Sequence, residues 1–295
     1  MKLPRILIQF DPDMAASVFD AVVAIDSDID HLLQYSQVEP TSVRGLVHGA
    51  MFTRGPDQLS NTAIFIGGSN AAASEAIAAE IKQTFFGPVR VSVMLDGNGS
   101  NTTAAAAVLC AARHLDLSAV DALVLGGTGP VGLRVARLLL RAGARVRLAS
   151  RDQARAAQAC EQLTAKTGEG SDRLSACGTA EPAELEQQLS QVNALFGCGA
   201  AGAQLLSAEQ LAQAHQLQVA IDLNAVPPAG LAGIAVTDKA VSRGGRVDYG
   251  AIGVGGLKMK IHREAIRTLY SRNDLFLDAE EVFEIGQQLE AAAKV

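Results

Sequence analysis

The sequence predicts an α/β protein with two lobes, of which one is a Rossmann-type, doubly wound parallel sheet. Apolar strand-like runs alternate with helical patterns along most of the 295 residues, which is typical of parallel α/β architecture. A glycine-rich turn at residues 126–132 joins one such strand to one such helix. Two further helical patterns, at residues 257–272 and 278–294, follow the last strand and should pack back on the first part of the chain.

The elements follow in order along the chain. We expect strands at residues 6–10, 21–25, 63–67 and 91–95, with helices at 71–85 and 102–115. Further strands are expected at residues 122–125, 146–149, 174–177, 194–197 and 219–223, separated by helices at 133–140, 153–166, 184–192 and 207–215. Residues 1–104 and 257–295 should then form a substrate domain and residues 105–256 a nucleotide-binding domain. Because open α/β sheets bind ligands beyond the carboxyl ends of their strands, the two lobes should face each other across a cleft.

The turn after residue 125 carries the dinucleotide-binding pattern G-x-G-x-x-G. Gly127 permits a tight turn, Gly129 lets the backbone approach a pyrophosphate, and Gly132 lets the helix pack closely on the strand. The helix then presents free N–H groups and its positive dipole end to the phosphates. The expected cofactor-binding residues of this turn are Gly127, Thr128, Gly129, Pro130, Val131 and Gly132.

The end of the second strand of this unit indicates which nucleotide binds. An NAD site usually has a carboxylate there, whereas this chain has Ser150 and Arg151, with Arg155 one helical turn later. A guanidinium binds a 2′-phosphate in bidentate fashion, so NADP is the predicted cofactor. Asp152 fits better as the cap of the next helix. The alternative is that both arginines are ordinary solvated charges.

Two later loops of the same unit lie where cofactor-contacting loops normally lie. The first contains Gly197 and Cys198, and the second begins with Asn224 and Ala225. Asn224, just past a strand, is suited to bind the nicotinamide carboxamide or ribose, and is equally suited to be a turn residue.

The polar loop after residue 95 is a candidate substrate site. Its side chains are suited to recognise an amide-rich heterocycle at the carboxyl end of a strand. The alternative is a glycine turn followed by a helix that Ser100 or Asn101 caps. The candidate residues are Asn98, Ser100, Asn101 and Thr102.

A second candidate is the glycine-rich stretch at residues 250–256. Four glycines in seven residues suggest that the backbone passes close to something, and the stretch opens onto a helix with cations. Lys258 and His262 are four residues apart and share a helix face, so they join Gly255 and Gly256 as candidates. Alternatively, Lys258 and Lys260 are solvated helix charges.

Composition excludes several classes of protein. A net charge of −6 without a basic run argues against nucleic-acid binding, and the apolar runs are too short to span a membrane. We expect no metal site, because the four cysteines and five histidines lack ligand spacing. Reduced thiols and the absence of a signal-peptide pattern indicate a cytoplasmic enzyme. No paired acids or nucleophilic triad emerges, which suits direct hydride transfer.

The chain resembles the methylene-tetrahydromethanopterin dehydrogenase family of one-carbon metabolism nearly from end to end. The resemblance rests on several motifs besides the nucleotide turn. These are Gln9-Phe10-Asp11, Ser17-Val18-Phe19-Asp20, Phe52-Thr53-Arg54-Gly55, Thr62-Ala63-Ile64-Phe65-Ile66-Gly67-Gly68, Phe85-Phe86-Gly87-Pro88, residues 94–103 and residues 253–263.

The resemblance implies reversible oxidation of the methylene bridge of a reduced pterin to the methenyl cation, with the hydride passing to NADP⁺. It implies Lys258 as the catalytic-site lysine, adds Phe19 and Asp20 to the substrate site, and implies a homo-oligomer. Tetrahydromethanopterin and tetrahydrofolate both remain candidate carriers, and NAD is a second candidate cofactor. The alternatives are another NADP-dependent two-lobe oxidoreductase, similar to shikimate dehydrogenase, or a non-catalytic NADP-binding sensor.

Overall fold

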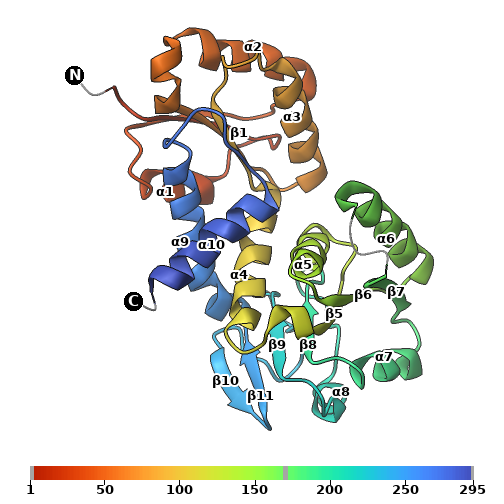
Figure 1. The fold of residues 1–295 in the computed structure, drawn as a ribbon. Helices are drawn as coiled ribbons and strands as arrows, with labels where there is room; N and C mark the ends of the chain where they lie inside the picture. Colours follow the sequence, from red (N-terminus) through yellow and green to blue (C-terminus); the bar gives the residue numbers. More distant parts are fainter. Residues whose placement is uncertain (1–2, 169–171, 294–295) are drawn as a thin grey trace. The chain divides into compact units, whose positions relative to one another are not determined.

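The computed structural model describes residues 3–168 and 172–293, which fall into two compact units (Figure 1). The first unit comprises Met1–Thr102 and Met259–Val295, and the second comprises Thr103–Lys258. Each unit is built on an open sheet of mainly parallel strands, which confirms the predicted α/β class. The division between the units falls within helices α4 (Ser100–Ala112) and α9 (Ala251–Thr268).

The first unit contains a five-stranded parallel sheet with the order β12-β4-β3-β1-β2. The order reverses beside β1, because β2 lies on one side of it and β3 on the other. Helices α2 and α3 cover one face, where their apolar side chains form a core with those of the strands. The bounds are β1 (Ile6–Phe10), α1 (Val18–Ile25), β2 (His31–Tyr35), α2 (Pro40–Phe52), β3 (Thr62–Ile66), α3 (Ala71–Thr84), β4 (Ser92–Leu95), β12 (Phe276–Leu277) and α10 (Ala279–Ala292).

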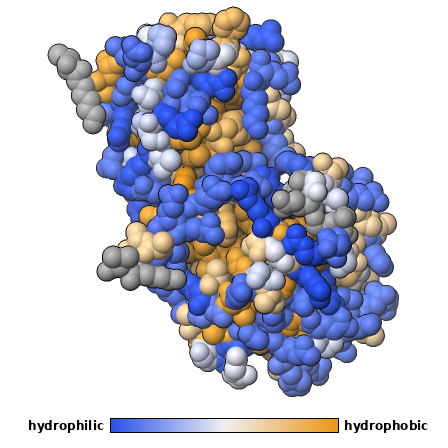
Figure 2. Space-filling model, viewed as in Figure 1, coloured by the Kyte–Doolittle hydropathy of each residue, from blue (hydrophilic) through white to orange (hydrophobic). Residues whose placement is uncertain are grey.

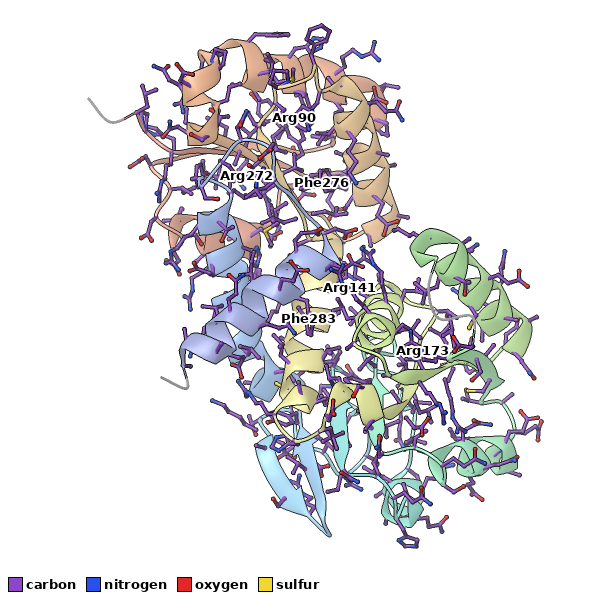
Figure 3. All side chains as sticks on the ribbon, viewed as in Figure 1. Arg90, Arg141, Arg173, Arg272, Phe276 and Phe283 are labelled. Atoms are coloured by element: carbon purple, nitrogen blue, oxygen red, sulfur yellow. The ribbon has the colours of Figure 1, made fainter. Side chains whose placement is uncertain are left out.

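The C-terminal segment is attached to the first unit through β12, which pairs in parallel with β4. Ser92 Oγ donates to the Arg272 carbonyl at 2.8 Å, and Asn273 Nδ2 donates to the Arg90 carbonyl at 3.0 Å. Lys82 lies 3.8 Å from the ring centre of Phe276. Figure 3 shows Arg90, Arg272 and Phe276 in this region. Residues from both parts of the chain therefore build this unit.

The second unit contains a seven-stranded sheet with the order β10-β11-β9-β8-β5-β6-β7, in which only β10 and β11 pair antiparallel. Here the order reverses beside β5. The strand bounds are β5 (Asp121–Leu125), β6 (Arg145–Ser150), β7 (Leu174–Gly178), β8 (Ala194–Gly197), β9 (Val219–Asp222), β10 (Lys239–Arg243) and β11 (Arg246–Tyr249). The helices are α5 (Pro130–Arg141), α6 (Gln153–Thr167), α7 (Pro182–Leu189) and α8 (Ala208–Gln213).

Most of the expected elements are present in the structure, but the segment after β1 differs. The strand expected at residues 21–25 is wrong, because these residues belong to α1. Ser17 caps this helix by accepting from the Asp20 N–H at 3.2 Å, and only Val23 and Ala24 are buried. Strand β2 and helix α2 were not expected, because β2 is an edge strand without buried alternation and α2 contains two glycines.

The glycine-rich stretch near residue 250 is also not a loop. Helix α9 begins at Ala251 rather than at residue 257, so three of the four glycines lie inside it. A Cβ on Gly250 would lie 2.1 Å from the Ala235 carbonyl oxygen, and one on Gly253 would lie 1.8 Å from that of Asp238. These two residues are therefore glycine because the backbone at residues 235–238 leaves no room for a Cβ atom.

Two short segments and one helix end also differ from the expected elements or lie outside the described residues. The β10–β11 hairpin was not expected, and the C-terminal segment holds β12 besides its helices. The expected end of the last helix, at Lys294, lies outside the described residues.

Over residues 3–168 and 172–293, no helix is both long and apolar enough to cross a membrane. Hydrophilic side chains dominate the face shown in Figure 2, with apolar areas between them.

We predict that Gly253→Ala destabilises the protein, because its Cβ cannot avoid the Asp238 carbonyl oxygen without displacing the backbone. The free energy of unfolding should fall by about 3 kcal/mol or more, as for a strongly overpacked core position. Gly255→Ala is the matched control in the same helix, since among the described residues no atom beyond its chain neighbours and the adjoining helix backbone lies within 4 Å of its Cβ position. It should stabilise the helix by up to about 1 kcal/mol. Urea titrations followed by circular dichroism measure both, and equal effects would contradict this explanation.

Candidate functional site

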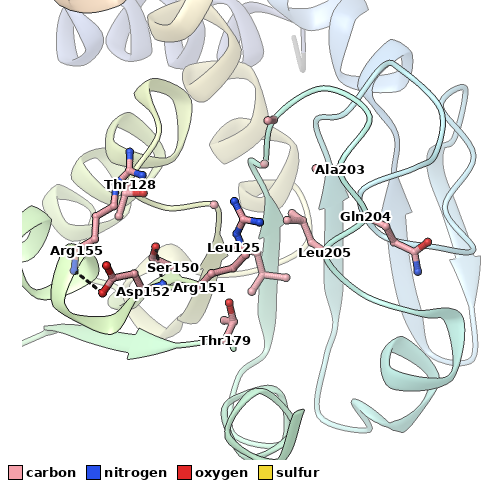
Figure 4. A pocket seen from close by; sticks show the side chains of 13 residues that line it. Leu125, Thr128, Ser150, Arg151, Asp152, Arg155, Thr179, Ala203, Gln204 and Leu205 are labelled. Atoms are coloured by element: carbon pink, nitrogen blue, oxygen red, sulfur yellow. Dashed lines mark hydrogen bonds between the residues drawn. The ribbon is translucent and has the colours of Figure 1, made fainter. Parts of the chain in front are cut away.

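The second unit has a cavity of about 290 Å³ at the carboxyl edge of its sheet (Figure 4). The loops after β5, β6, β7 and β8 contribute to it, so it lies where the strand order reverses. Dinucleotides bind at this place in doubly wound sheets. The lining residues are Leu125, Gly126, Thr128, Ser150, Arg151, Asp152, Arg155, Thr179, Gly199, Ala200, Ala203, Gln204 and Leu205.

The glycines of the turn have separate structural roles. Gly126, with φ of 66°, is the left-handed residue of the turn. Gly127 is required by packing instead, because a Cβ there would lie 2.8 Å from the Leu148 side chain. A Cβ on Gly132 would lie 2.7 Å from the Gly127 Cα, so this glycine brings α5 close to β5 as predicted.

Gly129 differs from the other glycines of the turn, since the nearest atom to its Cβ position is 3.4 Å away. The fold therefore tolerates a side chain here. Gly129 is the N-cap of α5, and this residue makes no side-chain cap bond to the helix. The first N–H groups of α5 consequently face a place where an anionic ligand can approach the backbone. This geometry fits a pyrophosphate.

Two arginines lie at the rim of the cavity. Arg151 extends from the end of β6, and Arg155 rises from the first turn of α6 (Figure 4). Asp152 caps α6 by accepting from the N–H groups of Ala154 at 2.9 Å and Arg155 at 3.3 Å, as the sequence predicted. Its carboxylate is therefore engaged by the helix. Ser150 completes a polar, cationic rim that suits a 2′-phosphate.

Asn224 organises two loops of the second unit. Its side-chain oxygen accepts from the N–H groups of Val226 at 3.0 Å and Gly202 at 3.3 Å, and its amide donates to the Pro228 carbonyl at 2.8 Å. Gly202 belongs to the segment between β8 and α8, which also lines the cavity. The structure therefore gives Asn224 the turn-residue role, while Ala225 lies exposed beside it.

Asp222 supports the same loop from the end of β9. The Asn224 N–H donates to one of its oxygens at 3.1 Å, and the Leu231 N–H donates to the other at 3.0 Å. Burial raises the pKa of this carboxyl group despite these bonds. Desolvation, with Asp222 nearby, also raises the pKa of the Cys198 thiol, so this cysteine stays protonated near neutral pH and is no activated nucleophile. Gly197 is the buried last residue of β8.

Most polar side chains of the loop after β4 are buried within the first unit and form hydrogen bonds there. Ser100, Asn101 and Thr102 are completely buried. The Asp96 carboxylate accepts from the N–H groups of Asn101 at 2.9 Å and Thr102 at 3.0 Å, so Asp96 caps α4 instead of Ser100 or Asn101. Asn101 Nδ2 also donates to Asp278 at 3.0 Å. Of the four candidates, only Asn98 exposes its side chain, and its φ is 55°.

The remaining candidates of the first unit lie around the place where its strand order reverses. Phe19 is 52% exposed in the first turn of α1. The Asp20 carboxylate lies so close to the turn after β3 that a Cβ on Gly67 would be 2.8 Å from its oxygen. The Asn98 N–H donates to the Gly68 carbonyl at 2.6 Å, which brings the loops after β3 and β4 together. Asp20 and Asn98 thus border the same carboxyl edge.

The candidates on α9 differ in exposure. Lys258 is half-buried, whereas Lys260 is exposed. His262, one turn after Lys258, is completely buried, with its ring stacked on Phe65 at 5.5 Å and its Nδ1 4.0 Å from an Asp96 oxygen. Gly255 and Gly256 lie on the helix, and among the described residues no atom beyond their chain neighbours and the adjoining helix backbone lies within 4 Å of their Cβ positions. In the described ranges, no group of three or more His, Cys, Asp and Glu is arranged to hold a metal ion.

Among the lining residues that were not predicted, Thr179, Gln204 and Leu205 come from segments to which the sequence analysis assigned no role in the site. Thr179 follows β7, and its position after a strand was the available signal. Gln204 and Leu205 come from the irregular segment before α8, for which no sequence pattern indicated proximity.

Comparisons with known proteins extend these observations. Residues 18–98 match the family described as methylene-tetrahydromethanopterin dehydrogenase, N-terminal, and residues 122–237 match the NAD dependent epimerase/dehydratase family. The chain is 39% identical over 287 residues to the Bifunctional protein MdtA of Methylorubrum extorquens, covering 97% of this chain and 99% of that protein. It is 32% identical over 294 residues to the NAD(P)-dependent methylenetetrahydromethanopterin dehydrogenase of the same organism, covering 96% and 98%.

Solved structures support the fold. Shikimate 5-dehydrogenase from Listeria monocytogenes aligns with a TM-score of 0.52 at 11% identity, over 97% of this chain and 96% of that chain. The 5-ketofructose reductase of Gluconobacter aligns with a TM-score of 0.50 at 11% identity, over 97% and 99%. At this identity the likeness concerns the fold alone.

We predict that Gly129→Ala weakens NADPH binding with little change in stability, whereas Gly132→Ala lowers the free energy of unfolding. The first variant should unfold within about 1 kcal/mol of the wild type, because its Cβ has room, yet it should bind NADPH at least roughly tenfold more weakly because the methyl group blocks the ligand. The second should lose about 2 kcal/mol or more of stability through overpacking. NADPH fluorescence titration and urea unfolding measure the two quantities. If Gly129→Ala binds NADPH normally, the phosphates do not pass this residue.

Proposed function

The chain belongs to the methylene-tetrahydromethanopterin dehydrogenase family, and we propose that it reversibly oxidises methylene-tetrahydromethanopterin to the methenyl form by direct hydride transfer to NADP⁺. The second unit is the NADP-binding part in this proposal, and the first unit contributes to the pterin site. The observation that supports the cofactor assignment is the cavity at the reversal of strand order, with Arg151 and Arg155 at its rim. Near full-length similarity to a named dehydrogenase supports the substrate.

The chemistry requires little acid or base catalysis from the protein. The methylene carbon lies between two nitrogen atoms, and their lone pairs stabilise the cation that forms as the C–H bond breaks and its electron pair leaves as hydride. NADP⁺ accepts the hydride and becomes NADPH. The protein's task is therefore to hold two rings in contact and to exclude water.

We assign Lys258 an orienting role in this reaction. An ammonium beside the reacting carbon would oppose the developing cation, so its useful place is at the pterin periphery, bonded to a carbonyl group. Its half-buried position on α9 supports this assignment, because Lys260 on the same helix is exposed. Phe19, Asp20 and Asn98 are the proposed substrate contacts of the first unit, supported by their position at the carboxyl edge of its sheet.

We further propose a cytoplasmic location and a homo-oligomeric state. The location is supported by the cysteines, all four of which are free thiols. The assembly is supported by the exposed apolar side chains of the first unit. A sedimentation mass of 30.7 kDa at micromolar concentration would show a monomer and reject the assembly.

The proposed reaction is tested by mixing purified protein with methylene-tetrahydromethanopterin and NADP⁺ and recording ultraviolet absorbance. We expect NADPH and the methenyl product to appear together in equal amounts. Methylene-tetrahydrofolate and NAD⁺ in parallel reactions measure the preference for carrier and cofactor. Shikimate with NADP⁺ tests the alternative oxidoreductase. Tight NADPH binding without turnover of any of these substrates would favour a sensor and reject the proposal.

We predict that Arg151→Glu weakens NADP⁺ far more than NAD⁺. Loss of a charge-assisted contact and repulsion of the 2′-phosphate should cost about 2–4 kcal/mol, or roughly 30- to 1000-fold in affinity. Arg145→Glu is the matched control, because Arg145 is exposed at the opposite end of the same strand. Titration of both cofactors measures the effect. An equal loss for both would show that Arg151 does not contact the 2′-phosphate.

We predict that Lys258→Ala lowers turnover by roughly 100-fold or more while NADP⁺ affinity stays within about twofold, because the lysine orients the pterin and not the cofactor. Lys260→Ala serves as the control, since this exposed residue points elsewhere on α9. Steady-state kinetics and NADPH titration separate the two quantities. Near-normal turnover of Lys258→Ala, with loss of turnover in Lys260→Ala, would contradict the assigned role.

A further inference from the structure

One wall of the cofactor cavity is an irregular segment, residues 198–206, which we call the wall segment (Figure 4). It lies between β8 and α8 and supplies five of the thirteen residues that line the cavity, more than any other segment. Its regular structure is confined to a two-residue turn at 201–202 and an isolated bridge at residue 206. Few bonds of its own therefore fix its conformation. Because a preformed surface binds a ligand more tightly than one that must first be ordered, the contacts that hold this segment bear on affinity.

The loop that follows β9 holds the wall segment at two places. At the turn, the Gly202 N–H donates to the side-chain oxygen of Asn224 at 3.3 Å. Further along, the N–H groups of Leu205 and Leu206 both donate to the Gly230 carbonyl, at 2.7 and 3.1 Å. Both acceptors belong to the loop after β9. The position of the wall segment therefore follows the position of that loop.

Asp222, the last residue of β9, fixes the support loop, by which we mean residues 224–231. One carboxylate oxygen accepts from the Asn224 N–H at 3.1 Å, and the other accepts from the Leu231 N–H at 3.0 Å. The carboxylate is 2% exposed, and a Cβ on Gly230 would lie 2.6 Å from it. Hydrogen bonds to a carboxylate are about twice as strong as those between neutral groups. Asp222 therefore fixes both ends of the support loop, where the acceptors for the wall segment lie.

Neither Asp222 nor Asn224 is among the described residues that line the cavity. Asn224 is 7% exposed, and its amide group donates to the Pro228 carbonyl within the support loop at 2.8 Å. Both side chains therefore act on a ligand through the backbone that they hold. The wall segment contains no charged residue, so the effect of its position on binding should not depend on ionic strength.

We propose that Asp222 and Asn224 are positioning residues that set the affinity for NADP from outside the cavity. Asp222 fixes the support loop, Asn224 connects this loop to the turn at Gly202, and the wall segment then presents a preformed surface to the dinucleotide. Asn224 thus serves the cofactor without the direct contact to nicotinamide or ribose that the sequence allowed. The inference rests on the proposed cofactor site and is independent of the pterin reaction.

Asn224→Ala tests the connection to the wall segment. Without the side-chain oxygen, the Gly202 N–H loses its acceptor, and the wall segment should no longer be held in one conformation in the free protein. Affinity for NADPH should fall roughly tenfold or more, by the same factor at low and at high salt. Fluorescence titration at two salt concentrations measures both quantities. A fall that vanishes at high salt would locate the effect at the charged rim of Arg151 and Arg155 and reject the proposal.

Asn193→Ala is the matched control in the same unit. Asn193 directly precedes β8, at the edge of the sheet opposite the cavity. Its side chain also bonds to backbone groups, since its oxygen accepts from the Asp121 N–H at 3.0 Å and its amide donates to the Ala119 carbonyl at 3.4 Å. Both substitutions remove bonds of an asparagine to the backbone, so both should lower the urea midpoint. Only Asn224→Ala should bind NADPH more weakly, whereas Asn193→Ala should stay within about twofold of the wild type.

Asp222→Asn supplies a second variant. An amide offers one oxygen in place of two, so either the Asn224 N–H or the Leu231 N–H loses its acceptor. NADPH affinity should fall, and the fall in the double variant with Asn224→Ala should be smaller than the product of the two single falls, because both act on one segment.

Three outcomes would overturn the positioning role. They are an unchanged NADPH affinity of Asn224→Ala, an equal fall for Asn193→Ala, and a fall in the double variant that equals the product of the single falls. A wild type that does not bind NADPH would reject the cofactor site together with the positioning role. The readout is binding, so a failure of the proposed pterin reaction would leave these results unaffected.

Discussion

The second unit depends on the close approach of the first turn of α5 to the end of β5. Gly132 lies so near the backbone of Gly126 and Gly127 that a Cβ there would come within 2.9 Å of three of their atoms. No other residue type permits this approach. It aims the N-terminus of α5 at the carboxyl edge of the sheet, and without it the free N–H groups would not face the cavity. The loops after β6, β7 and β8 then complete the site around this fixed point.

The two units differ in how the helix that begins at the carboxyl edge of the sheet is capped. In the first unit, Asp96 satisfies the first N–H groups of α4, and the neighbouring polar side chains are buried in bonds to the fold. In the second unit, the corresponding helix is capped by Gly129 without a side chain. A capped helix end is closed to ligands, whereas an uncapped one attracts an anion. The contrast explains why we assign the phosphates to the second unit.

Much of this organisation could be predicted from sequence, because the nucleotide unit follows strong local rules. The glycine spacing, the apolar strands and the arginines after β6 can each be recognised from residues that are close together in the sequence. The cap role of Asp152 was predicted for the same reason. The left-handed conformation of Gly126 could not be predicted from the pattern, because Gly126 and Gly127 are both glycines.

The failures concern segments whose structure depends on a partner that the residue pattern does not identify. Residues 21–25 are all apolar and three of them are β-branched, yet they belong to the helix that Ser17 caps. The glycine-rich stretch at residues 250–256 was a candidate substrate site, whereas Gly250 and Gly253 accommodate the backbone at residues 235–238. Ser100, Asn101 and Thr102 were suited to a polar pocket, but Asp96 and Asp278 engage them inside the unit. Local patterns do not reveal which partner a glycine or a polar group has.

The binding of NADP in the cavity of the second unit is tested most directly by the affinity of the protein for the adenosine half of the cofactor. Isothermal titration of the intact protein with 2′-phospho-ADP-ribose and with ADP-ribose isolates the contribution of one phosphate, without the pterin or hydride transfer. We expect the 2′-phosphorylated ligand to bind at least roughly 30-fold more tightly at low ionic strength, and we expect this difference in affinity to shrink as salt is added. Equal affinities would contradict the assignment of Ser150, Arg151 and Arg155 to the 2′-phosphate.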